Sequence, residues 1–157
     1  MESLVVYDSQ YGNTKQVAHA IADGLRPHGP VRLLALDKVL PHDLGTVDLL
    51  FVGGPTQAHG ISARIRLFLD ALEARSAKGT VAAAFDTRYR MPTLISGSAA
   101  KTIARRLQRA GLRIFAPPAS FFVSRQGREL RQGEAERAQV WAKSVADALV
   151  LSHWCAA

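Results

Sequence analysis

The chain has 157 residues, of which 48% are hydrophobic, and a formal net charge of +7. This length and apolar content exclude a disordered chain and suit one domain with its own core, which we expect to span residues 1–157. No apolar run approaches the roughly 18 residues needed to cross a bilayer, so we expect no membrane role.

The first half of the chain alternates strand-like and helix-like patterns. Residues 4–7 form an apolar run typical of a buried strand, and apolar side chains over residues 17–25 follow the spacing of one helical face. A second strand is predicted at residues 31–36. A third is predicted at residues 47–52, where the sequence is almost continuously apolar, as in a central parallel strand.

The second half continues the same alternation. The predicted elements are a helix over residues 61–72, a strand over 81–85, a loop over 86–97, a helix over 100–110, a strand within 112–123 and a helix from 134 to 149. Pro117 and Pro118 interrupt the last strand. Because proline cannot donate to a sheet ladder, we expect an edge strand there.

Strands that alternate with helices predict an α/β domain, a doubly wound three-layer sandwich with a five-stranded parallel sheet. Right-handed crossovers leave few topologies, and the strand order 2-1-3-4-5 is our prediction. In such a sheet, ligands bind beyond the carboxyl ends of the strands at the point where the order reverses. The loops after the first, third and fourth strands should therefore meet at one crevice.

The most informative stretch is Ser9-Gln10-Tyr11-Gly12-Asn13-Thr14, the turn between the first strand and its helix. Such a turn aims backbone N–H groups and the positive end of a helix at one point, where a phosphate can bind. The hydroxyls of Ser9 and Thr14 can donate to the same phosphate, and Gly12 permits a sharp bend. The alternative is an ordinary capped turn with Asn13 or Thr14 as the helix N-cap.

The pattern Ser-x-Tyr-Gly-Asn-Thr after a first strand resembles the FMN phosphate loop of flavodoxins, whose pattern is Ser/Thr-x-Thr/Tyr/Phe-Gly-Asn-Thr. The resemblance covers about residues 2–151. No long insertion splits the fifth strand, so the chain looks like a short-chain member. The resemblance implies a flavodoxin-like fold, FMN as cofactor and an electron-transfer role in which the flavin carries the redox chemistry.

The same resemblance assigns the second loop to the flavin. Gly54-Pro55-Thr56 resembles the Gly-x-Pro-Thr of many flavodoxin-like proteins, and Thr56 would bond the ribityl chain or the pyrimidine. His59-Gly60 would pass the N5 edge of the ring. His59 stands where the family usually has tryptophan or methionine, and the alternative is an exposed loop histidine.

The third loop offers Tyr89, since flavodoxins commonly stack a tyrosine on the outer face of the flavin. The neighbouring Asp86-Thr87-Arg88 departs from the usual glycine-rich or acidic sequence, and the alternative is an exposed loop aromatic. No catalytic acid or base and no metal ligand is predicted. The predicted cofactor-binding residues are Ser9, Gln10, Tyr11, Gly12, Asn13, Thr14, Pro55, Thr56, Gln57, Ala58, His59, Gly60, Asp86, Thr87, Arg88 and Tyr89.

The excess positive charge lies in residues 87–128, which carry nine basic residues and no acidic one. Four of them recur every fourth residue and would form one stripe on a helix, with Arg106 beside it: Lys101, Arg105, Arg109 and Arg113. The plain interpretation is a solvated outer face. Because classical flavodoxins are acidic around the flavin, the alternative is a redox partner protein that is acidic or carries phosphate.

Cysteine content bears on location and on other chemistries. The single cysteine, Cys155, excludes an internal disulfide and a cysteine metal cluster, and no signal-peptide pattern opens the chain, so we expect the reducing cytoplasm. The five histidines show no metal spacing. The first loop lacks the cysteine of a low-molecular-weight phosphatase. Gly53-Gly54, rather than a phosphorylatable aspartate, ends the third strand, which argues against a receiver domain.

Nucleotide P-loop and dinucleotide glycine motifs are also absent from the sequence. Two alternative functions stay open at this point. One is an FMN-dependent NAD(P)H:quinone or flavin reductase, which the absence of a visible nicotinamide motif weakens. The other is a flavin-free binding module that uses its basic face on nucleic acid, and sparse aromatic residues for base stacking disfavour it.

Overall fold

The computed structural model describes residues 1–45, 47–58, 60–75, 79–126 and 128–155. Its strands are β1 (Ser3–Tyr7), β2 (Val31–Ala35), β3 (Leu49–Pro55), β4 (Val81–Tyr89), β5 (Arg113–Ile114) and β6 (Ala119–Val123). Its α-helices are α1 (Asn13–Leu25), α2 (Ala63–Arg75), α3 (Thr93–Ser96), α4 (Ala99–Arg109) and α5 (Glu134–Cys155). Three short 3₁₀ helices are η1 (Arg26–His28), η2 (Leu36–Lys38) and η3 (Pro41–Leu44).

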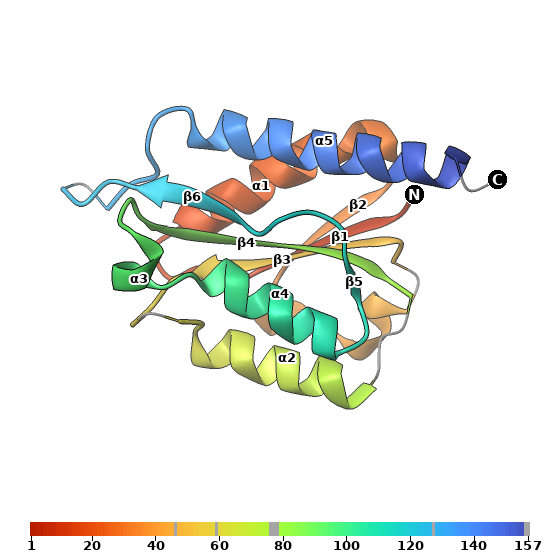
Figure 1. Ribbon diagram of the computed structural model, residues 1–157, viewed down its shortest axis with the longest axis horizontal. Helices are drawn as coiled ribbons and strands as arrows, with labels where there is room; N and C mark the ends of the chain where they lie inside the picture. The colour runs from red at the N-terminus through yellow and green to blue at the C-terminus, as the bar shows by residue number, and fades with distance from the viewer. Residues whose placement is uncertain (46, 59, 76–78, 127, 156–157) are drawn as a thin grey trace.

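All strand pairs of the sheet are parallel, and the order is β2-β1-β3-β4-β5, with β6 also paired to β4. Helices α1 and α5 cover one face of the sheet, and α2 and α4 cover the other (Figure 1). The predicted three-layer sandwich and the strand order 2-1-3-4-5 are therefore confirmed. Among the described residues, no helix is both long and apolar enough to cross a bilayer.

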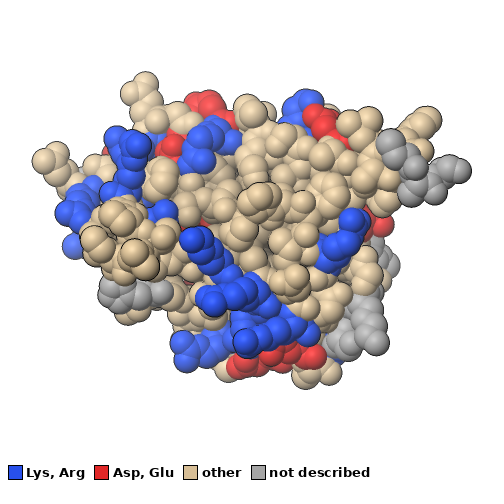
Figure 2. Space-filling view, viewed as in Figure 1, with Lys and Arg blue, Asp and Glu red and all other residues tan. Residues whose placement is uncertain are grey.

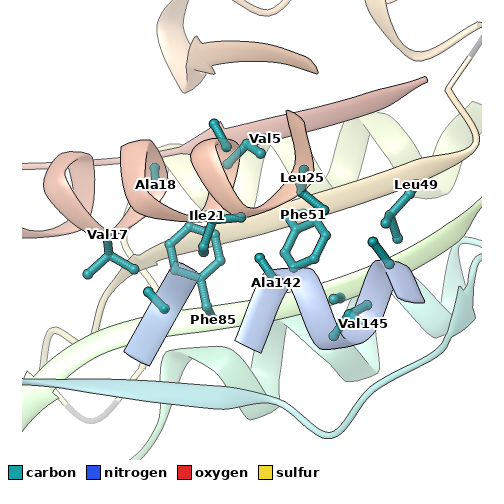
Figure 3. Close-up of a cluster of buried hydrophobic side chains, with 14 of the residues drawn as sticks. Val5, Val17, Ala18, Ile21, Leu25, Leu49, Phe51, Phe85, Ala142 and Val145 are labelled. Carbon is teal, nitrogen blue, oxygen red and sulfur yellow. The ribbon is translucent and has the colours of Figure 1, made fainter. Parts of the chain in front are cut away.

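The core is divided by the sheet into two clusters. On the α1 and α5 side, Ile21 and Leu25 pack towards Phe51 and Phe85 of the central strands (Figure 3). Trp141 of α5 meets Phe51 edge to face, with ring centroids 5.3 Å apart and an interplanar angle of 87°. The near-continuous apolar runs of β1 and β3 thus reflect burial on both faces, as expected of central parallel strands.

The fourth strand is longer than the sequence predicted. We expected it to end at Phe85, but β4 continues to Tyr89 because Phe85–Tyr89 pairs with Ala119–Val123 of β6. Residues 86–89, predicted as loop, are therefore held in the sheet. Their side chains consequently alternate between the two faces of a strand.

The predicted fifth strand is split into two short pieces. Arg113–Ile114 pairs with the start of β4, and pairing resumes at Ala119, after Pro117 and Pro118. Prolines carry no N–H for the ladder, which explains the break between the pieces. The one strand that either piece pairs with, within the part of the chain that is described, is β4, and Val123 adds a single antiparallel bridge to Leu130 in the loop that follows. The predicted edge position is therefore confirmed.

The end of β3 requires glycine because side chains of β4 and α2 lie against its backbone. A Cβ added to Gly53 would lie 2.3 Å from the Phe85 ring, and one added to Gly54 would lie 2.1 Å from a terminal methyl of Ile65. Both contacts are shorter than side-chain packing allows. The two glycines thus let the side chains of Phe85 and Ile65 pack directly against the backbone at the end of β3, before the loop that begins at Thr56.

Candidate functional site

A cavity of about 310 Å³ lies where the carboxyl ends of β1, β3 and β4 meet. Its volume is at the lower end of the range of small-molecule sites. Eleven of the sixteen predicted cofactor-binding residues line it, together with two that were not predicted: Ser9, Gln10, Tyr11, Asn13, Thr14, Pro55, Thr56, Gln57, Thr87, Arg88 and Tyr89, with Val123 and Arg128. The three segments predicted as loops therefore do meet at one crevice, although the third contributes residues of β4 rather than of a loop.

The first loop turns sharply at Gly12, whose φ of +90° is a left-handed conformation that favours glycine. Ser9 Oγ accepts hydrogen bonds from the N–H groups of Gly12 (3.1 Å) and Lys15 (3.3 Å), which leaves its own proton free to donate outwards. Within the described chain, the backbone N–H groups of Asn13 and Thr14 have no hydrogen-bond acceptor. These are the orphan donors of a helix N-terminus and suit an anion.

Two side chains of the first loop, those of Asn13 and Thr14, form hydrogen bonds to other parts of the protein. Thr14 Oγ1 lies 2.8 Å from Thr87 Oγ1 of β4, in a buried contact. Asn13 Nδ2 donates to the backbone oxygen of Arg128 at 2.7 Å. Neither side chain caps α1, whose N-cap is Gly12 with no side-chain cap bond. The first loop is thus fastened to β4 and to the loop that follows β6.

Thr56, expected to bond the ribityl chain or the pyrimidine, has a hydroxyl engaged in the protein. It donates to Asp86 Oδ2 (3.1 Å) and accepts from the N–H of Ala99 (2.9 Å). Only its second lone pair is left for a ligand. Thr56 still lines the cavity, and its position is set by the start of α4.

Asp86 is completely buried and does not line the cavity. Its Oδ2 accepts from Thr56, from Ser98 Oγ (2.8 Å) and from the N–H of Ala100 (3.0 Å). Its Oδ1 has no hydrogen-bond partner and lies 3.9 Å from Arg88 Nε. Because Asp86 lies within β4 rather than in a loop, its carboxylate faces the N-terminus of α4. Through its bonds to Thr56, Ser98 and Ala100, Asp86 connects the second loop to that helix.

The second loop closes in a tight turn. The backbones of Gln57 and Gly60 exchange two hydrogen bonds of 2.8 and 2.9 Å, and Ala58 has a φ of +42°. Gln57 Nε2 donates to Gln10 Oε1 at 2.7 Å, which bridges the first and second loops. Ala58 and Gly60 are not among the lining residues, and the predicted role of His59 lies outside the described residues.

Arg88 is held by the protein rather than by solvent. Its Nε donates to Ser120 Oγ (3.0 Å), and its Nη1 donates to Met91 O (2.8 Å) and Ser96 Oγ (3.0 Å). Only 11% of its side chain is exposed. Tyr89, by contrast, is 39% exposed at the cavity, with the Arg125 guanidinium 5.9 Å from its ring centroid.

Sequence reasoning missed Val123 and Arg128. Val123 ends β6, and the rule that parallel strands finish at one edge of the sheet would have placed it near the site. Arg128 lies in the loop between β6 and α5, and no local pattern marks it. Among the described residues, no group of three or more histidine, cysteine, aspartate or glutamate side chains is arranged for a metal ion.

The donor set and the shape of the cavity fit FMN. Two N–H groups that have no acceptor within the described residues, together with the Ser9 hydroxyl, supply the donors that a phosphate requires. A Cβ added to Gly12 would meet no atom within 4 Å, so the loop borders open space. Among the lining residues, the exposed rings of Tyr11 and Tyr89 offer aromatic surface that suits a flat ring system.

The doubly wound parallel sheet with strand order β2-β1-β3-β4-β5 is typical of the flavodoxin-like class of α/β proteins. The loop of residues 9–14 after β1, with its two N–H groups that have no acceptor within the described chain, is the candidate anion loop. The family model of flavodoxin matches residues 5–141. The chain therefore belongs to the flavodoxin family. FMN, the cofactor of flavodoxins, is the cofactor that the family assigns to this chain.

One curated relative and several solved structures resemble the chain. A flavodoxin from Aquifex aeolicus (strain VF5) is 38% identical over 69 residues, which are 43% of this chain and 37% of that protein. A flavodoxin from the domain Archaea superposes with a TM-score of 0.81 at 23% identity, covering 94% of this chain and 98% of the other. Flavodoxin 1 from Bacillus cereus superposes with a TM-score of 0.79 at 18% identity, covering 94% of this chain and 98% of the other.

A larger protein contains the same fold. Rubredoxin oxygen:oxidoreductase from Desulfovibrio gigas superposes with a TM-score of 0.78 at 20% identity, over 96% of this chain but 36% of that protein. At these identities the structural matches show the fold alone. The fold is thus found both in proteins of similar length and as a part of a longer protein.

Proposed function

We propose that residues 1–157 act as a single FMN-binding electron-transfer domain in the cytoplasm, with the cofactor phosphate at the Ser9–Thr14 loop. The observation that carries the proposal is the pair of N–H groups at Asn13 and Thr14, which have no acceptor within the described chain. They border the cavity that the first loop forms with the ends of β3, β4 and β6. When bound, FMN supplies the capacity to take up and release electrons. The protein binds it, orients it and sets the charge around it.

The residues of the cavity divide by the part of FMN they would contact. The first loop, with the Ser9 hydroxyl, would hold the phosphate. The exposed rings of Tyr89 and Tyr11 border the cavity and are the candidates for packing against the flat ring. Asp86 supports the site indirectly, because it fixes Thr56. The residues that approach the N5 edge stay a prediction, since His59 is not described.

The first test is the visible absorption spectrum of the purified protein, followed by titration of the full-length apoprotein with FMN and with riboflavin. We expect a yellow protein that binds FMN more tightly than riboflavin. The double substitution Asn13→Ala with Thr14→Ala should weaken FMN binding, and Gln16→Ala, on the exposed face of α1, is the control. A protein that takes up neither flavin would overturn the proposal and favour a flavin-free module.

The proposed redox partner is an acidic protein. The exposed cations proposed for docking are Arg90, after the end of β4, and a row on α4 formed by Lys101, Arg105 and Arg109. Helix α4 begins at the site, where the N–H of Ala99 donates to Thr56, and runs away from it, so Lys101 is the member of the row nearest the cavity. Figure 2 shows this row of basic side chains running across the face of the molecule, beside acidic side chains on the neighbouring helix. Complementary charges steer such partners together and raise the association rate.

Three basic residues of the segment 87–128 do not belong to this surface. Arg88 is bound inside the protein, and Arg106 pairs with Asp70 and Glu73 of α2. Arg113, predicted on the same helical stripe, is in β5 instead, with its guanidinium 5.3 Å from the centroid of the Phe115 ring. The docking proposal therefore rests on the α4 row and Arg90.

Charge reversal tests the docking surface. We expect Arg105→Glu with Arg109→Glu to slow electron exchange with a ferredoxin of net negative charge, and the wild-type rate to fall as salt rises. Arg26→Glu with Lys143→Glu makes the same charge change on the opposite face of the sheet and is the matched control. Equal rates in both double variants would show that the α4 row takes no part.

A further inference from the structure

Arg128 occupies a constrained position in the loop between β6 and α5. The loop is closed by hydrogen bonds from Ser124 N to Glu129 O (2.8 Å) and from Arg128 N to Ser124 O (3.0 Å). The carbonyl of Arg128 accepts from Asn13 Nδ2 at 2.7 Å, and its φ is +52°. A non-glycine residue in this left-handed region persists only where its surroundings hold it there. The backbone of Arg128 is therefore fastened to the first loop.

The side chain of Arg128 also contacts the first loop, through Tyr11. Its guanidinium lies 5.9 Å from the centroid of the Tyr11 ring, a cation–π arrangement, and both residues line the cavity. In the described part of the chain, no carboxylate lies within ion-pair distance of this guanidinium. A positive charge without a counter-ion thus stands beside the N–H groups of the anion loop.

Arg125, three residues earlier, is placed differently. Its guanidinium lies 5.9 Å from the ring centroid of Tyr89 and donates to Met91 Sδ at 2.7 Å. Both of its contacts are to the segment at the end of β4, and neither is to the first loop. The loop after β6 therefore carries two arginines with similar aromatic contacts, of which only Arg128 is directed at the anion site.

We propose that Arg128 binds the phosphate of FMN and makes the site select the phosphorylated flavin over riboflavin. This inference rests on the proposed function, because it assumes that FMN occupies the cavity. Backbone N–H groups supply directed hydrogen bonds to a phosphate, and a guanidinium adds a full charge and a planar pair of donors. Asn13 and Tyr11 hold the arginine in place before the ligand arrives, which lowers the entropy lost on binding.

The substitution Arg128→Gly is the sharpest test, because glycine accepts the positive φ and removes only the side chain. We expect the affinity for FMN, measured by quenching of flavin fluorescence on the full-length apoprotein, to fall roughly tenfold, as for the loss of one charge-assisted hydrogen bond. The affinity for riboflavin should stay unchanged. Arg128→Lys should restore part of the loss.

Arg125→Ala is the matched control, and its ratio of FMN to riboflavin affinity should equal that of the wild type. The wild-type preference for FMN should also decline with salt more steeply than that of Arg128→Gly. If Arg128→Gly weakens both flavins equally, or neither, the inference is wrong while FMN binding by the wild type stands. If the wild type binds no FMN, the proposed function itself fails.

Discussion

The side-chain oxygens of Thr14 and Thr87 lie 2.8 Å apart in a buried contact between the start of α1 and the end of β4. The two residues are 73 positions apart in the chain. The bond holds the anion loop against the strand that carries Arg88 and Tyr89. The geometry of the site therefore depends on a contact inside the protein as well as on the groups that face the cavity.

We expect Thr87→Val to lower the free energy of unfolding by about 1–3 kcal/mol, because it leaves the buried Thr14 hydroxyl without its partner. The double variant Thr14→Val with Thr87→Val removes both hydroxyls and should cost less than the sum of the two single changes. Urea unfolding of the three variants measures this coupling. Strictly additive losses would mean that the contact contributes little to stability.

Asp86→Ala should destabilise the fold by about 3 kcal/mol, since two hydroxyls and one backbone N–H lose their buried charged acceptor. Asp86→Asn should cost less, because its amide oxygen can still receive those donors. We also expect Asp86→Ala to weaken FMN binding through the displacement of Thr56. Chemical denaturation and flavin titration measure the two effects.

The control for Asp86 is Asp37→Ala. Asp37 is exposed in η2, and its loss should change stability by less than about 0.5 kcal/mol. If Asp86→Ala and Asp37→Ala behave alike, the buried carboxylate does not organise the second loop.

Gly53→Ala should destabilise the protein by about 1–3 kcal/mol, because the new methyl group would press on the buried Phe85 ring 2.3 Å away. Gly60→Ala, where a Cβ meets nothing within 4 Å, is the control. Adding Phe85→Leu to Gly53→Ala should relieve the overlap, so the double variant should lose less stability than the sum of the two. Thermal unfolding is a sufficient measurement, and a sum that is merely additive would contradict the steric explanation.

Glu134 should make stability depend on pH. Burial raises its pKa, but hydrogen bonds from Arg137 and from the N–H of Phe122, with the charges of Arg137 and Arg131, outweigh burial and hold the pKa below the ordinary value of 4.5. A carboxyl with a depressed pKa stabilises the fold above its unfolded pKa. That contribution to stability is lost as the pH falls through the lowered pKa that Glu134 has in the folded protein.

Glu134→Gln should therefore be less stable than the wild type by about 2 kcal/mol at neutral pH, as for the loss of hydrogen bonds to a charged group. The difference should shrink as the pH falls below 4.5 and disappear under the lowered pKa. Glu136→Gln, exposed in the same first turn of α5, is the control. Denaturant unfolding of wild type and Glu134→Gln over this pH range measures the stability difference. A difference that does not change with pH would contradict the role given to the Glu134 carboxylate.

The sequence alone determined the class of fold and the position of the candidate anion loop after the first strand. Apolar runs at β1 and β3, helical spacing over α1 and the motif from Ser9 to Thr14 are local patterns, and local patterns follow from the period of a strand or helix. The rule for parallel sheets then brought three distant loops together. Eleven predicted residues accordingly line the cavity, although their contacts with FMN stay predictions.

Only the tertiary structure decided how those residues are used. Asp86 and Arg88 were predicted in a loop, but pairing with β6 placed them in a strand, where both are held by protein groups. Arg128 reaches the anion loop across 115 residues of sequence through its bond with Asn13. No local periodicity encodes such contacts, because they depend on which segments the sheet places side by side and on the direction in which each side chain then points.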